Sequence, residues 1–122
     1  MLPRTVLVAD DHRATRQVLR ELLEIDGWAV IEARDGVEAV RKAAEGHPTA
    51  IITDLGMPRM DGLSAARALR SDPSTADIYL IAVTAQELTD EQWEGLGALF
   101  DQVLQKPVRP QMLRRRLAQA VA

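Results

Sequence analysis

Short apolar runs and segments with helical periodicity alternate along the 122 residues of the chain. The apolar runs have the length and β-branched content of strands that are buried on both faces. These predicted strands are residues 5–9, 29–33, 50–53, 78–83 and 102–105. After each strand, apolar residues recur three or four positions apart, which predicts amphipathic helices. The predicted helices are residues 12–25, 36–45, 63–70, 89–99 and 110 to the C-terminus.

Five consecutive strand–helix units define the fold class. Such alternation predicts an α/β domain whose parallel sheet is covered by helices on both faces, with right-handed crossovers. The length is that of one domain, so residues 1–122 are predicted to form it. In open sheets of this kind ligands bind beyond the carboxyl ends of the strands. The residues that directly follow each strand are therefore the candidates for chemistry.

Composition and charge narrow the functional classes. The chain is 47% hydrophobic and 27% charged, with a formal net charge of −3 and a pI of about 5.3. This acidity argues against a nucleic-acid or anionic-membrane partner. The chain has no cysteine, which excludes disulfides and thiolate metal sites and fits a reducing compartment. The first ten residues resemble neither a signal peptide nor a membrane span, so we expect a cytoplasmic protein.

Polar residues whose side chains could bind a ligand or react follow four of the five strands. They are Asp10, Asp11, Asp54, Thr84 and Lys106. Because the carboxyl ends of parallel strands meet at one edge, we expect these side chains to converge. Two carboxylates ~4 Å apart repel by roughly 4 kcal/mol at an effective dielectric constant near 20. A divalent cation would offset this repulsion, and a small set of oxygen ligands favours Mg²⁺.

A lysine and a threonine beside these acids indicate a phosphoryl site. Only two of the 15 basic residues are lysines, Lys42 and Lys106. A compact ammonium suits a single phosphate oxygen better than the arginine fork does, and the hydroxyl of Thr84 could donate to another oxygen. A carboxylate in such a site can attack phosphorus and form an acyl phosphate. Phosphoryl transfer otherwise needs mainly positioning and charge neutralisation.

Four motifs stand in order at these strand ends: "ADD" at 9–11, "TDLGMPRMDG" at 53–62, "VTA" at 83–85 and "QKP" at 105–107. Together they resemble a response-regulator receiver domain of two-component signalling, similar to the stand-alone chemotaxis regulators, over essentially the whole chain. The resemblance implies a flavodoxin-like doubly wound sheet with strand order 2-1-3-4-5. It also implies a regulatory switch that accepts a phosphoryl group and is not an enzyme acting on other substrates. Such a switch catalyses only its own phosphorylation and dephosphorylation.

The resemblance assigns a role to each acidic residue. Asp54 matches the phosphoacceptor, which takes a phosphoryl group from a histidine kinase or a histidine phosphotransfer protein. Asp11 matches the direct Mg²⁺ ligand and Asp10 its partner, which often acts through water. Asp54 also belongs to the metal shell, and the backbone carbonyl of Gly56 completes it.

The resemblance also assigns the remaining site positions. Thr84 matches the switch hydroxyl and Lys106 the phosphate-binding lysine, with a cis peptide bond expected between Lys106 and Pro107. The implied kinase-docking surface is the exposed side of the first helix, near Ala14, Thr15 and Val18. One position departs from the family: Val103 stands where a tyrosine or phenylalanine usually couples to the threonine.

Two other functions fit parts of the pattern. One is a Mg²⁺-dependent phosphohydrolase with an aspartate nucleophile, although the acids after the first strand lack the D-x-D spacing of the haloacid type. The other is a pseudo-receiver or flavin-binding fold that only docks partners. His12, beside the acids, is interpreted as a first-turn helix residue rather than a catalytic one. No output module follows the last helix, so the downstream partner is open, and a stand-alone regulator and a fragment of a longer protein are both expected possibilities.

Overall fold

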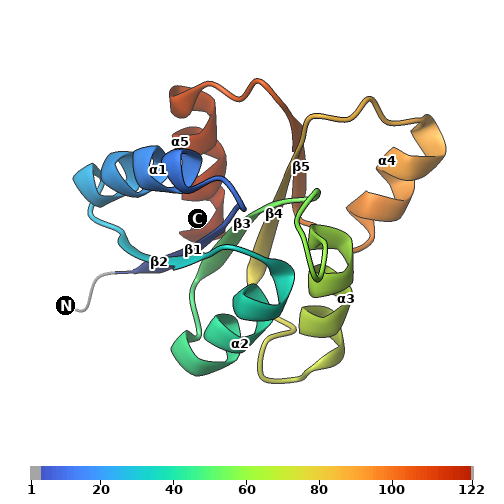
Figure 1. The fold of residues 1–122 in the computed structure, drawn as a ribbon, viewed down its shortest axis with the longest axis horizontal. Coiled ribbons are helices and arrows are strands. Elements are labelled where there is room, and N and C mark those ends of the chain that lie inside the picture. Colours follow the sequence, from blue (N-terminus) through green and yellow to red (C-terminus); the bar gives the residue numbers. More distant parts are fainter. Residues whose placement is uncertain (1–3, 122) are drawn as a thin grey trace.

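The computed structural model describes residues 4–121, in which a five-stranded parallel sheet lies between two layers of helices (Figure 1). The strands are β1 (Thr5–Ala9), β2 (Ala29–Ala33), β3 (Ala50–Asp54), β4 (Tyr79–Thr84) and β5 (Gln102–Gln105). The helices are α1 (Arg13–Ile25), α2 (Gly36–Gly46), α3 (Gly62–Ser71), α4 (Asp90–Gly97) and α5 (Pro110–Ala118), followed by the 3₁₀ turn Gln119–Val121. The predicted domain of residues 1–122 also includes positions 1–3 and 122, which lie outside the described residues.

The strand order is β2-β1-β3-β4-β5 and every neighbouring pair is parallel, which confirms the flavodoxin-like fold. The predicted boundaries hold to within two residues, except that the last helix, predicted to reach the C-terminus, ends at Ala118 and is followed by the 3₁₀ turn. Two differences affect the site: β3 extends to Asp54 and β4 to Thr84, because these residues still pair in the ladders, Asp54 with Val83 and Thr84 with Gln105. The predicted 89–99 helix is shorter, since Thr89 is its N-cap and forms a capping box with Gln92.

The continuous apolar strands are explained by burial on both faces of the sheet. Successive side chains of a strand point to opposite faces. Leu7, Ile51 and Leu80 therefore pack with α2, α3 and α4, whereas Val8 and Ile52 pack with α1 and α5. These two cores fix the sheet rigidly, so its carboxyl edge can hold side chains in defined positions.

Close backbone contacts hold the loop that follows β3. A Cβ on Gly62 would lie 2.4 Å from the carbonyl oxygen of Asp54, and a Cβ on Gly36 would lie 2.1 Å from that of Met60. The Gly36 amide donates a hydrogen bond of 2.9 Å to the Met60 carbonyl. Glycine at both positions lets the turn before α2 and the start of α3 close on this loop.

A helix that crosses a membrane must be both long and apolar. Across residues 4–121, none of the helices is both long and apolar enough to span a bilayer. The cytoplasmic location stays a prediction.

Candidate functional site

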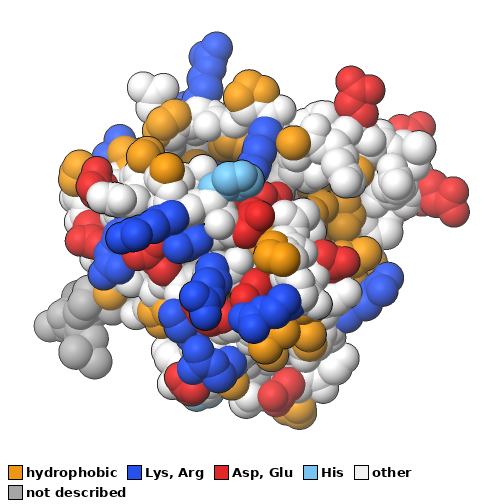
Figure 2. Space-filling model, in the orientation of Figure 1, with side chains coloured by type: hydrophobic (Ala, Val, Ile, Leu, Met, Phe, Trp, Pro, Cys, Tyr) orange, Lys and Arg blue, Asp and Glu red, His pale blue; other side chains and the backbone are white. Residues whose placement is uncertain are grey.

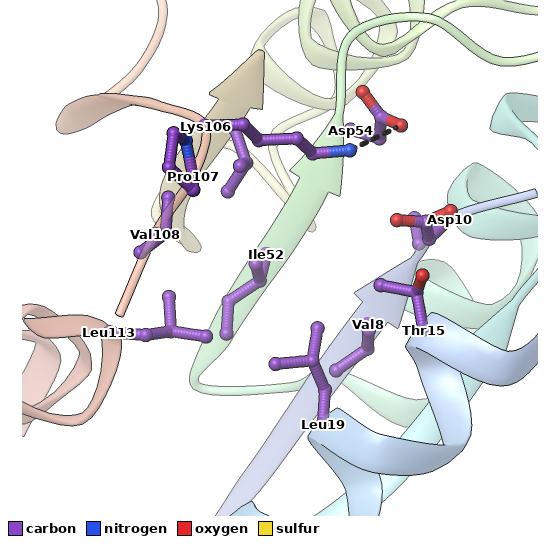
Figure 3. Close-up of a pocket in the computed structure, with 12 residues that line it drawn as sticks. Val8, Asp10, Thr15, Leu19, Ile52, Asp54, Lys106, Pro107, Val108 and Leu113 are labelled. Carbon is purple, nitrogen blue, oxygen red and sulfur yellow. Dashed lines mark hydrogen bonds and ion pairs between the residues drawn. The ribbon is translucent and has the colours of Figure 1, made fainter. Parts of the chain in front are cut away.

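Three charged residues from separate strand ends line one cavity at the carboxyl edge of the sheet. Asp10 follows β1, Asp54 ends β3 and Lys106 follows β5, and all three border a cavity of about 470 Å³. Figure 3 shows their side chains at one end of this cavity, with apolar side chains from the sheet, α1 and α5 below them. The structure thus brings together residues that lie up to 96 positions apart (10 and 106).

Asp54 forms an ion pair with Lys106. The Lys106 Nζ lies 3.2 Å from Asp54 Oδ2, and the Gly56 amide donates to Asp54 Oδ1 at 3.2 Å. The Asp54 side chain is 12% exposed and borders the cavity, from which it can be reached. Asp54 therefore combines an accessible oxygen nucleophile with an adjacent fixed cation.

Asp10, Asp11 and His12 form a second group beside this pair. Each offers one ligand atom, and these atoms all lie within 4.8 Å of one another. Asp10 is 5% exposed, and its Oδ1 accepts a 2.8 Å hydrogen bond from the His12 amide. Asp54 lies outside this group but borders the same cavity as Asp10, so a metal shell shared by Asp54 and both acids stays a prediction. His12 was not among the metal-binding candidates predicted from the sequence. Its position directly after the two acids is the feature of the sequence that could have indicated it.

Thr84 is 1% exposed and joins two loops of the site. Its Oγ1 accepts a hydrogen bond of 3.1 Å from the Gln86 amide, and its carbonyl accepts one of 2.7 Å from the Lys106 amide. The side-chain amide of Gln105 donates to the Gln86 carbonyl at 3.2 Å. The Thr84 hydroxyl is therefore hydrogen-bonded to the loop that leads to α4.

The remaining predicted positions are placed as follows. The Lys106–Pro107 peptide bond is cis. Ala14, Thr15 and Val18 are exposed on α1, and Thr15 alone of these borders the cavity. Val103 packs partly buried against the core on the α2–α4 side, and Phe100 is 3% exposed within that core.

An ion pair that the sequence did not predict, between the buried Asp35 and the exposed Arg59, holds the loop of residues 55–61 that follows β3. Asp35 caps α2, is 2% exposed, and accepts hydrogen bonds from the Glu38 amide and from Arg59 Nε at 2.8 and 3.0 Å. The Glu38 amide and the Arg59 guanidinium hold the pKa of the Asp35 carboxyl below its ordinary value of 3.8, against the opposing effect of burial. Arg59 has a positive φ of 65°, so its conformation depends on this contact.

A charged groove of about 490 Å³ adjoins the site between α1, β2 and α2. Figure 2 shows basic and acidic side chains intermingled over this face. Glu32 accepts from Arg16 at 3.2 Å and from Arg20 at 2.8 Å, and these guanidinium groups, Arg20 first, lower its pKa. The basic side chains of the groove are thus largely paired with acids.

The fold and the site together define a class, and comparison with known proteins gives the same result. The family model of the response regulator receiver domain matches residues 6–118, so the chain belongs to the receiver domains, a regulatory family of two-component signalling. It is similar to the response regulator MprA of Mycobacterium sp. (strain KMS), with 42% identity over 106 residues. That alignment covers 87% of this chain and 45% of MprA, so the chain spans less than half of this relative.

Solved structures share the same fold. The chemotaxis response regulator CheY4 of Vibrio cholerae superposes with a TM-score of 0.88 at 28% identity, over 98% of this chain and 99% of CheY4. The receiver domain of the sensor histidine kinase PA1611 from Pseudomonas aeruginosa PAO1 gives a TM-score of 0.88 at 29% identity, over 98% of each chain. The PA1611 structure contains a magnesium ion coordinated in the active-site cleft.

Proposed function

We propose that this chain is a Mg²⁺-dependent phosphoacceptor switch in which Asp54 takes a phosphoryl group from a histidine kinase or a histidine phosphotransfer protein. The observation that carries the proposal is the Asp54–Lys106 pair of 3.2 Å, which borders one cavity with the buried Asp10. A carboxylate that can be reached from a cavity and lies beside a fixed ammonium is suited to attack phosphorus and then to retain the product. Phosphorylation would change the affinity of the domain for a downstream partner.

The donor set fits a divalent cation. Asp10 is almost fully buried; among residues 4–121 its carboxylate accepts a hydrogen bond from the His12 backbone amide, and Arg16 Nη1 donates to its backbone carbonyl rather than to the carboxylate. Lys106, the nearby cation, is already paired with Asp54. Asp10, Asp11, Asp54 and the Gly56 carbonyl would hold Mg²⁺, as oxygen ligands that this ion prefers. When bound, Mg²⁺ would neutralise charge on the transferring phosphoryl group.

The chain's own residues account for the rest of the transfer. An oxygen of Asp54 attacks the phosphorus of phosphohistidine, the P–N bond breaks, and the histidine nitrogen keeps the electron pair. Lys106 Nζ then binds a phosphoryl oxygen in place of the Asp54 carboxylate oxygen. The Thr84 hydroxyl turns from the Gln86 amide toward another phosphoryl oxygen, which would shift the loop before α4.

Partner docking follows from the same placement. Ala14, Thr15 and Val18 are exposed on the α1 side of the site, and Val18 is 62% exposed. This side of α1 is the proposed docking surface for the kinase or phosphotransfer protein. The MprA-like relatives are about twice as long as the matched region, and an output domain or separate effector would read the phosphorylated state.

The test is labelling by acetyl phosphate, followed by intact-mass measurement and peptide mapping. We expect one phosphoryl group on Asp54, formed with Mg²⁺ and not formed when a chelator is present during the labelling reaction. Asp54→Ala should not be labelled, whereas Asp61→Asn, which keeps a cap for α3 in the same loop, should be labelled like the wild type.

The same experiment separates the two alternatives. Continuous release of phosphate without a stable adduct would support a phosphohydrolase, and absence of any reaction would support a docking module. Labelling of Asp54→Ala at the wild-type rate, or labelling unaffected by the chelator, would contradict the proposal.

A further inference from the structure

His12 presents a nitrogen atom to the same two acids that the proposed Mg²⁺ site uses. Its Nδ1 lies 3.3 Å from Asp11 Oδ1 and 3.4 Å from Asp10 Oδ1. The imidazole nitrogen thus faces two carboxylate oxygens. One of them, Asp10 Oδ1, already accepts a hydrogen bond from the His12 backbone amide. A single N–H proton bridges two such oxygens poorly, whereas a metal ion can bind all three atoms.

The separations match those expected around a small transition ion. Zn²⁺ binds imidazole nitrogen and carboxylate oxygen at roughly 2.0–2.2 Å in tetrahedral geometry, which places two ligand atoms about 3.4 Å apart. The octahedral geometry of Mg²⁺, with ligands at about 2.1 Å, places neighbouring ligands only about 3.0 Å apart. The two nitrogen–oxygen separations, 3.3 and 3.4 Å, are closer to the tetrahedral value, and the ligand atoms of Asp10 and Asp11 lie within 4.8 Å of each other.

The surroundings of His12 leave room for the remaining ligands. Its side chain is 73% exposed and that of Asp11 is 34% exposed, so water can reach this side of the group. Asp10, on the inner side, is 7% exposed at its side chain and provides a fixed anchor. One imidazole and two carboxylates with open positions form a donor set that suits first-row transition ions, because nitrogen ligands favour these ions over Mg²⁺.

We propose that His12 Nδ1 is a metal ligand, and that together with Asp10 and Asp11 it makes the acidic site of this receiver bind Zn²⁺ more tightly than Mg²⁺. The proposal rests on the metal site of the proposed function and adds one ligand and a metal preference to it. Zn²⁺ bound there would occupy the two acids that Mg²⁺ requires, so it would compete with Mg²⁺ for the site.

Isothermal titration of the metal-free protein with ZnCl₂ and, separately, with MgCl₂ tests the proposal. In the wild type we expect a lower Kd for Zn²⁺ than for Mg²⁺. His12→Asn should raise the Kd for Zn²⁺ by roughly tenfold or more, since perturbing even the outer shell of a metal site has effects of 10–100-fold. The Kd for Mg²⁺ should change by less than about twofold, because Mg²⁺ uses oxygen ligands.

The chain provides a matched control in its only other histidine. His47 is exposed, has a positive φ of 43° at the end of α2, and tolerates asparagine, which readily adopts this conformation. His47→Asn should leave both affinities unchanged. In the nitrogen NMR spectrum of the imidazoles, Zn²⁺ should shift the Nδ1 signal of His12 and Mg²⁺ should not.

Three results would overturn the proposal. They are a Zn²⁺ affinity in the wild type no higher than that for Mg²⁺, no loss of Zn²⁺ affinity in His12→Asn, or an equal loss for both metals, which would mean that His12 only positions the acids. Failure of the phosphoacceptor proposal is detected separately, by the absence of Mg²⁺-dependent labelling of Asp54, and the Zn²⁺ titrations judge His12 whatever that result is.

Discussion

Individual carboxylates at the sheet edge have different surroundings, and these differences determine what each can do. Asp54 is neutralised by Lys106 and borders the cavity, from which it can be reached. Asp10 is buried, and its Oδ1 is close to the exposed His12 imidazole. Asp35 is also buried, but both of its carboxylate oxygens accept hydrogen bonds, one from the Glu38 amide and one from Arg59. Buried charge without a fixed partner is unfavourable unless a cation binds, so Asp10 is the residue whose charge most needs a metal.

Replacing Asp10 with asparagine tests this account of buried charge. Asp10→Asn keeps an oxygen acceptor for the His12 amide but removes the charge. In metal-free buffer we expect stability to rise by about 1 kcal/mol, which corresponds to roughly 3–6 °C in Tm for a domain of this size. The gain should disappear in saturating Mg²⁺, because only the wild type then gains binding energy. Asp61→Asn, at an exposed cap, is the control, and a lower metal-free Tm for Asp10→Asn would contradict the account.

The Asp35–Arg59 contact predicts a defined pH dependence. The folded-state pKa of Asp35 lies below its ordinary value of 3.8, so the carboxylate stabilises the fold above that value. The stabilisation is lost as the pH falls through the folded-state pKa. Asp35→Asn should therefore be less stable than the wild type by on the order of 1–3 kcal/mol at pH 7, as expected for hydrogen bonds to a charged group. The difference should stay constant down to about pH 4 and vanish at lower pH.

Urea denaturation between pH 7 and pH 3 measures this difference. In an Arg59→Met background the effect of Asp35→Asn at pH 7 should be smaller, because part of the interaction has already been removed. A stability difference that persists unchanged below the folded-state pKa would show that shape rather than charge is responsible.

At the scale of elements, the sequence predicted the strands and helices, because these depend on the local pattern of apolar and polar residues. The five strands and five helices follow from apolar runs and helical spacing, and the strand ends place Asp10, Asp54 and Lys106 at one edge. The contacts of the loops were not predictable, because they join residues far apart in sequence through particular backbone conformations. Arg59 reaches Asp35 across 24 positions with a positive φ, and the Thr84 hydroxyl accepts a hydrogen bond from the Gln86 amide.

The close packing of the glycines beside the loop of residues 55–61 can be tested by comparison with Gly95, which has no neighbouring atom within 4 Å. Gly62→Ala would place a methyl group 2.4 Å from the Asp54 carbonyl, so we expect a loss of about 1–3 kcal/mol. Gly95→Ala, within α4, meets nothing within 4 Å and should raise stability by up to about 1 kcal/mol through helix propensity. Thermal denaturation of both variants gives the comparison. If the two changes had the same sign, close packing at Gly62 would not be the reason for the glycine.

At the scale of the whole molecule, hydrogen bonds of the Thr84–Gln86 loop connect the site to the α4 side of the domain. The Gln86 amide is bonded to Thr84, and the Gln86 carbonyl is bonded to the side chain of Gln105 on β5. Helix α4, which follows, buries only Leu96 fully, so little packing opposes its displacement. With Val103 in place of an aromatic residue, this hydrogen-bonded connection is the route by which Thr84 would affect the α4 surface.

Trp93, half-buried on α4, can report whether this route operates. In a Trp28→Phe background, phosphorylation by acetyl phosphate and Mg²⁺ should change the Trp93 emission, because the loop before α4 moves when Thr84 releases the Gln86 amide. Thr84→Val removes the hydroxyl, so it should keep labelling of Asp54 measurable by mass but reduce the emission change by at least half at equal labelling. Because the comparison is made at equal labelling, slower phosphorylation of the variant does not affect it. An undiminished emission change in Thr84→Val would mean that α4 responds to phosphorylation without the threonine, through Lys106 or the loop of residues 55–61 instead.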